Sequence, residues 1–235
     1  TWYGNVTMTD NLATTPANFD PYCISAPVNS QLPGGGGNQI CGLYDINPTK
    51  FGQVNNRIEF ATDRSEVYNG VELSMTGRLP NRAELSGGVS TGSTLIDNCY
   101  VVDSPAPRFC RTTVPFGAQT QIKVFGTYPL PWDLAFSANF QDVPGIPITA
   151  SYVATSAQIA SSLGRNLSAG ARGTATIDLI DPNAIREDRR RQLDVRLSRT
   201  LKMRTARVLG TFEVFNLLNA SSVLQMTTVY GAAWL

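Results

Sequence analysis

The sequence predicts an all-β protein, an antiparallel transmembrane β-barrel segment of about six full strands with long extracellular loops. Apolar and polar residues alternate over runs of about 9–11 residues, which exceeds the usual soluble strand and matches the span of a membrane β-strand. Each run has one apolar and one polar face, as expected when one side of a barrel contacts lipid and the other lines its lumen. Short turns also alternate with long segments three times along the chain, which is typical of outer-membrane barrels.

The first part of the chain combines a strand remnant, a long irregular segment and a hairpin. Residues 2–9 predict the remnant, and residues 10–65 are expected to be irregular because they hold many prolines and glycines. The hairpin has strands at 71–79 and 84–91, joined by a tight turn at 80–82. Val71, Leu73, Met75 and Leu79 lie on one face of its first strand, with the two-residue period of a β-strand.

The middle of the chain repeats this arrangement. A second long loop, at 92–117, leads to strands at 119–128 and 132–141. A short proline-containing turn at 129–131 is expected to join them.

The last hairpin has the clearest alternation. It follows a third long segment, 143–190, in which one short strand is expected at 174–180. Its own strands are predicted at 191–201 and 207–216, around a basic turn at 202–206. Apolar side chains share one face of its first strand: Leu193, Val195, Leu197 and Leu201.

Three residues close to the short turns indicate a membrane interface. Tyr128 and Trp132 flank one turn, as aromatic residues do in the belts at the two membrane surfaces. Arg199 interrupts an apolar face beside another turn, where its long stem can reach the interface. The alternative is that both aromatic residues belong to the core of a soluble β-sandwich.

Four cysteines form two close pairs in the sequence, Cys23 with Cys41 and Cys99 with Cys110. Both pairs lie outside the alternating runs, and their spacing matches no zinc motif. Two local loop disulfides in an oxidising compartment are therefore predicted. The alternative is four free thiols in a cytosolic protein.

The composition argues against catalysis and against nucleic-acid binding. A net charge of +1 provides no basic surface for phosphates, and the chain has no histidine to act as a general base. No cofactor or metal site is expected, and the protein is not predicted to be an enzyme. Four loop aspartates lack the dense spacing of a calcium loop: Asp97, Asp103, Asp178 and Asp181.

The polar faces of the predicted strands carry charges of both signs. These side chains are the candidates for lining the lumen of the barrel. They are Glu72, Arg78, Glu84, Lys123, Asp133, Asp194, Arg196 and Glu213. Their mixed charge does not specify a solute.

Several strand-and-turn stretches, taken in order, resemble one known family. They include YNGVELSMTGRLPN (68–81), YPLPWDLAFSANFQ (128–141), RRQLDVRLSRTLK (190–202) and FEVFNLLNASSV (212–223). In their order and spacing they resemble the C-terminal barrel region of TonB-dependent outer-membrane receptors. The closest similarity is to the Oar-like branch, which has a carboxypeptidase-regulatory-like N-terminal domain. The resemblance extends over essentially the whole chain.

The resemblance implies a location in the bacterial outer membrane and a role in the uptake of an unidentified large solute. A barrel of this family has about 22 strands around a plug, so residues 1–235 would supply less than a third of it. The plug, the TonB box and the final strand are expected to lie outside these residues. Expected partners are outer-membrane lipid and lipopolysaccharide, the rest of the barrel and the plug, and TonB through the N-terminal parts.

A second function class remains open from the sequence. The chain could be a secreted all-β binding or adhesion module with two loop disulfides, whose apolar faces pack between two sheets. The two alternatives differ in their need for an amphiphile, because only the membrane protein leaves an apolar face uncovered in water.

Overall fold

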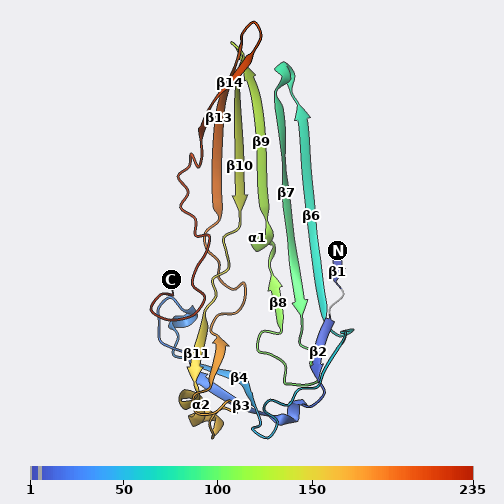
Figure 1. The fold of residues 1–235 in the computed structure, drawn as a ribbon, viewed down its shortest axis with the longest axis vertical. Helices are drawn as coiled ribbons and strands as arrows, with labels where there is room; N and C mark the ends of the chain where they lie inside the picture. Colours follow the sequence, from blue (N-terminus) through green and yellow to red (C-terminus); the bar gives the residue numbers. More distant parts are fainter. Residues whose placement is uncertain (1, 5–6, 235) are drawn as a thin grey trace.

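The computed structural model describes residues 2–4 and 7–234, and its strands are all paired antiparallel. Eight strands form one tall sheet, with smaller elements gathered at one of its ends (Figure 1). The strands of this main sheet lie in the order β1 (Trp2–Gly4), β6 (Ser65–Arg78), β7 (Glu84–Asp97), β9 (Gln121–Leu130), β10 (Leu134–Val143), β13 (Arg190–Lys202) and β14 (Arg207–Val214), and β8 (Arg111–Val114) also pairs with β7. The six long strands agree with the predicted hairpins, and β6 and β7 are longer than expected.

The three tight turns lie at the same end of the main sheet, as the alternation of short turns and long segments predicts (Figure 1). The short 3-10 turn η3 (Pro80–Arg82) joins β6 to β7, with Asn81 and Arg82 both at φ 63°. The turn between β13 and β14 closes with a hydrogen bond of 2.8 Å from Met203 N to Ala206 O.

The turn between β9 and β10 lies two residues later than predicted. Pro129 stays in the ladder opposite Ala135, and Leu130 pairs with Leu134. The reversal uses Trp132 and Asp133 instead, at φ 66° and 56°. A proline lacks only the N–H donor, so it can remain in a strand where that donor is not needed.

The three long segments are more ordered than the sequence suggested. Residues 10–65 were expected to be irregular but contain paired strands, and the loop at 92–117 gives its first residues to β7. The elements in these segments are β2 (Thr7–Asn11), η1 (Pro16–Asn18), β3 (Phe19–Ser25), η2 (Pro33–Gly35), β4 (Gln39–Ile46), β5 (Asn56–Phe60), α1 (Phe116–Gln119), β11 (Ser151–Thr155), α2 (Ser156–Leu163) and β12 (Thr174–Asp178). The extra strand predicted at 174–180 is β12, which pairs with β11. Of the remnant predicted at 2–9, residues 5 and 6 lie outside the described residues.

Both disulfides form between the predicted cysteines, but only the second lies in a loop as expected. The bond between Cys23 and Cys41 links the paired strands β3 and β4, so it does not lie in an irregular loop. The bond between Cys99 and Cys110 closes the connection from β7 to β8.

The main apolar core lies at the end of the molecule opposite the tight turns. We call the unit formed by β3, β4, β11, β12 and α2 the cap. Its core contains the side chains of Tyr22, Ile24, Ala26, Ile40, Ala154, Ile159, Leu167 and Ile177. A second, smaller cluster beside it contains Leu32, Ala150, Ile180 and Trp234. No described helix is long and apolar enough to cross a membrane.

Candidate functional site

The main sheet has two continuous and chemically different faces. Residues directly opposite each other in neighbouring strands share a face, and pairing between the long strands shows no shift in register. One face, which we call the apolar face, includes the pairs Leu73–Val89, Phe136–Leu197 and Leu197–Phe212. The other, the polar face, includes Arg78–Glu84, Asn139–Asp194 and Arg196–Glu213.

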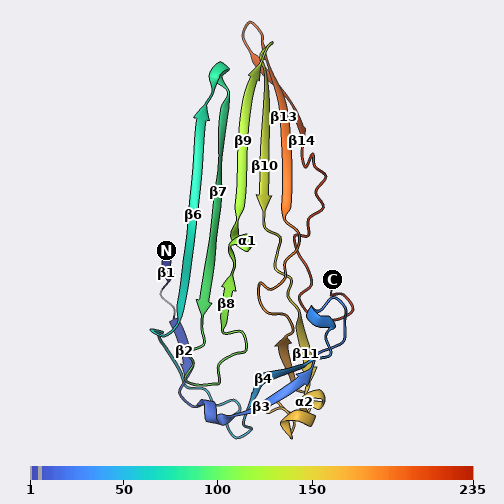
Figure 2. The ribbon, with the colours of Figure 1, turned by 180° about the vertical axis from the view of Figure 1, so that it is seen from behind.

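The apolar face is open to its surroundings. Leu73 is 71% exposed and Phe212 is 68% exposed, at opposite sides of the sheet. The two opposite views show no described element lying across the tall part of the sheet (Figures 1 and 2). Further large apolar residues on this face are also exposed: Val71, Met75, Val89, Val124, Tyr128, Leu130, Phe136, Leu197, Leu201 and Val208. A contiguous exposed apolar surface marks a region that contacts a partner or a membrane.

The residues predicted to lie at a membrane interface are near the turn end of the sheet. Arg199 is exposed on the apolar face, opposite Leu134 and Gly210. Tyr128 and Trp132 are 47% and 79% exposed. Neither aromatic side chain therefore lies in a core formed by the described residues.

The polar face carries seven of the eight lumen candidates. Arg196 forms an ion pair with Glu213 on the neighbouring strand. Asp194 accepts hydrogen bonds from the Gln192 side chain and, at 2.8 Å, from the backbone N–H of Asn216. These contacts order the polar face at the β13–β14 edge.

Where the polar face runs over β6, β7 and β9, its charged side chains form fewer ion pairs. Nε of Arg78 lies 3.6 Å from a carboxylate oxygen of Glu84, a surface contact of small energy. Glu72 and Lys123 form no ion pair with a described residue, and both line a hollow of about 310 Å³. This hollow offers one positive and one negative group to a solute or to another part of the protein.

Asp133 is the exception among the lumen candidates. It was expected in a strand but lies in the turn between β9 and β10. Its carboxylate accepts a hydrogen bond of 3.0 Å from Nζ of Lys202. The assignment of Asp133 to a strand was wrong because the turn lies two residues later than Pro129 and Pro131 suggested.

Arg189 attaches the beginning of β13 to its surroundings at the cap end. Its guanidinium donates hydrogen bonds of 2.7 Å to a carboxylate oxygen of Asp142, 3.1 Å to Gly117 O and 2.7 Å to Thr120 O. Nε of Arg191 lies 3.4 Å from the other carboxylate oxygen of Asp142, so at least two charges of the basic stretch at 185–191 are used internally. Burial lowers the pKa of Arg186 in the same stretch.

Arg165 joins two distant parts of the cap. Its guanidinium lies 2.6 Å from a carboxylate oxygen of Asp20 and 2.5 Å from one of Asp45, so it bridges β3, β4 and the loop after α2. Burial acts to lower the pKa of Arg165, but its hydrogen bonds to the two aspartates and their charge raise it overall. Since Asp20 is 145 positions away, sequence spacing did not reveal this contact.

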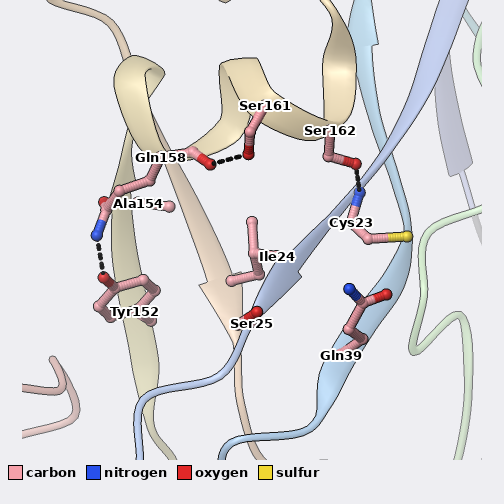
Figure 3. A pocket seen from close by; sticks show the side chains of 9 residues that line it. All are labelled: Cys23, Ile24, Ser25, Gln39, Tyr152, Ala154, Gln158, Ser161 and Ser162. Atoms are coloured by element: carbon pink, nitrogen blue, oxygen red, sulfur yellow. Dashed lines mark hydrogen bonds between the residues drawn. The ribbon is translucent and has the colours of Figure 1, made fainter.

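The cap contains two clefts that the sequence did not predict. One, of about 520 Å³, lies between the β3–β4 hairpin and α2 (Figure 3). The other, of about 510 Å³, is bordered by β4, β12 and the loop closed by the second disulfide. Arg108 crosses the second cleft with a hydrogen bond of 2.9 Å to Asp178 O, and its guanidinium lies 4.5 Å from the centre of the Phe109 ring.

No group of three or more acidic or cysteine side chains in the described part of the chain could hold a metal ion. Two of the loop aspartates have other contacts, since Asp97 lies 3.5 Å from Arg111 and Asp103 accepts a hydrogen bond from Asn11 N.

No family model, curated protein or solved structure matches the chain.

Proposed function

We propose that residues 1–235 form part of the wall and external mouth of a β-barrel in the bacterial outer membrane, within a TonB-dependent receptor that takes up a large solute. The main sheet would be the wall, and the cap with the neighbouring loops would be the mouth. The observation that carries the proposal is the open apolar face, which is continuous over six long strands. In this role the chain moves a solute and performs no chemistry.

Lipid would cover the apolar face of the main sheet, which is open in the described part of the chain. Burial of apolar surface contributes about 25 cal/mol per Å², so an uncovered face of this extent is strongly unfavourable in water. The six strands contain 8 to 14 residues, and a tilted strand needs about 9–11 residues to cross the hydrocarbon core. Arg199, Tyr128 and Trp132 near the turn end then lie where a membrane–water interface is expected.

The two edges of the sheet explain why this piece would belong to a larger barrel. β14 pairs only with β13, and β1 covers β6 only from Glu66 to Tyr68. Inside a membrane every backbone N–H and C=O must be paired, so both edges require further strands. We propose that the rest of the parent barrel supplies them.

The polar face would then line the lumen. Glu72 and Lys123 are free to meet a solute or the plug, whereas Arg196 and Glu213 neutralise each other. Outer-membrane lipid and lipopolysaccharide would contact the opposite face, and TonB would act through N-terminal parts outside these residues.

A secreted binding or adhesion module is the second candidate. The observation in its favour is the cap, which has an apolar core of its own and a disulfide between its strands. Disulfides fit any oxidising compartment outside the cytoplasm. A module of this kind must cover the apolar face of the main sheet with another protein layer.

Site-directed spin labelling of the parent receptor in outer-membrane vesicles tests the proposal. Single cysteines at Leu73, Val89 and Leu197 probe the apolar face, and matched cysteines at Ser74, Ser90 and Ser198 probe the polar face. We expect the first set to be relaxed by oxygen dissolved in lipid, and the second by a water-soluble nickel chelate. Equal access of the nickel chelate to both sets would contradict the proposal.

A further inference from the structure

The cleft between the β3–β4 hairpin and α2 has an apolar floor and a polar rim. Ile24 and Ala154 form the floor and are 6% and 0% exposed. Tyr152, Gln158, Ser161, Ser162, Gln39 and Ser25 surround Ile24 (Figure 3). The volume of about 520 Å³ lies within the range of small-molecule sites, about 300–1,000 Å³.

Intramolecular bonds hold one wall of this cleft in place. Gln158 accepts a hydrogen bond of 2.8 Å from Thr155 N in a capping box and donates one of 2.7 Å to the Tyr152 hydroxyl. The Tyr152 ring also packs edge-on against Tyr230, with the two ring centres 6.1 Å apart. The aromatic wall is therefore ordered before any ligand arrives, which lowers the entropic cost of binding.

The same bonds leave hydrogen-bonding capacity toward the cleft. The hydroxyls of Tyr152 and Ser162 accept from Gln158 and from Cys23 N, so each keeps its proton for a further bond. Ser161 uses its proton on Gln158 O and keeps its lone pairs. The side chains of Gln39 and Ser25 bond no described residue. The rim thus offers both donors and acceptors.

The lining of this cleft contains no charged side chain. An anionic or cationic ligand would lose its hydration there without gaining an opposite charge. A purely apolar ligand would leave the rim hydroxyls and amides without partners. We infer that the cleft binds a neutral saccharide, whose C–H face packs on Ile24 at the floor and whose hydroxyls pair with the rim.

This inference does not rest on the proposed function. The cleft belongs to a unit with its own core, and a saccharide site is compatible with a membrane receptor and with a secreted module. The outcome of its test is therefore independent of whether the main sheet lies in a membrane.

A glycan array provides the test. The full chain, kept in lauryldimethylamine oxide because that detergent has no sugar headgroup, is applied to neutral oligosaccharides, uronic acids and sulfated glycans. We expect binding to at least one neutral oligosaccharide and to none of the charged glycans. The double variant Gln39→Ala/Ser25→Ala should weaken that binding at least about tenfold, as expected for the loss of two hydrogen bonds.

The matched control is Gln31→Ala/Ser30→Ala, which removes the same side chains from an exposed segment outside the cleft. It should bind as the unchanged protein does. Both variants replace exposed residues, and unchanged circular dichroism would show that folding is preserved. Absence of binding to every neutral glycan, or binding that the Gln39→Ala/Ser25→Ala variant leaves intact, would overturn the inference.

Discussion

At the scale of single residues, a few arginines determine how the loop segments are held together. Arg165 contacts Asp20 and Asp45 from the far side of the cap, and Arg189 connects Asp142 to the C-terminal end of α1. Charge-assisted hydrogen bonds of this kind are shorter and stronger than neutral ones. Segments that the sequence presents as irregular thereby acquire fixed positions.

Replacement of Arg165 by alanine should destabilise the cap. Arg165 and Asp45 are both mostly shielded from water, and the substitution leaves two carboxylates close together without a cation. We expect a loss of about 2 kcal/mol in the free energy of opening of the cap, measured by hydrogen exchange of amides in β3 and β4. Arg172→Ala is the control, since Arg172 is exposed in the same loop and forms no ion pair with a described residue. Equal effects of the two substitutions would show that the ion pairs do not hold the cap.

At the scale of elements, the long strands could be predicted and most of the short ones could not. Alternation over about ten positions identifies β10 and β13 because one face is apolar, apart from Arg199 near the end of β13. β3 contains a proline, β4 contains a positive-φ glycine, and the two strands pair with a bulge, so their alternation is interrupted. Their order depends on core contacts with β11, β12 and α2, which no local pattern contains.

Helix α2 is a different case, because its signals were present in the sequence. Thr155 and Gln158 have the spacing of a capping box, and Gly164 ends the helix at φ 76°. The helix has only eight residues, so its periodic pattern is too short to be distinguished from that of a loop. The sequence did not predict the two clefts of the cap either, because they form only when these short elements pack together.

The disulfide of the β3–β4 hairpin should stabilise the cap. It closes a sequence separation of 18 residues, which the chain-entropy account values at about 3 kcal/mol. The double variant Cys23→Ala/Cys41→Ala should therefore lower the free energy of cap opening by about that amount, measured by hydrogen exchange in detergent. Unchanged protection of β3 and β4 in this variant would mean that the core alone holds the hairpin together.

At the scale of the whole molecule, burial is distributed unevenly. The cap buries its apolar residues in its own core, whereas the main sheet leaves one apolar face open and two strand edges without partners on most of their length. The two faces follow from alternation and could be predicted from the sequence. Closure into a barrel depends on strands beyond these edges, so it belongs to the proposal. Exposed strand edges of this length carry unpaired backbone groups and are templates for aggregation in water.

Sedimentation of the isolated chain, residues 1–235, tests the central claim most directly. Samples in plain buffer and in lauryldimethylamine oxide would be compared by analytical ultracentrifugation at the same protein concentration. If the apolar face belongs in lipid, the chain should aggregate in plain buffer and become monodisperse only with detergent. A sharp monomer peak with cooperative unfolding in plain buffer would contradict the membrane assignment and favour the secreted module.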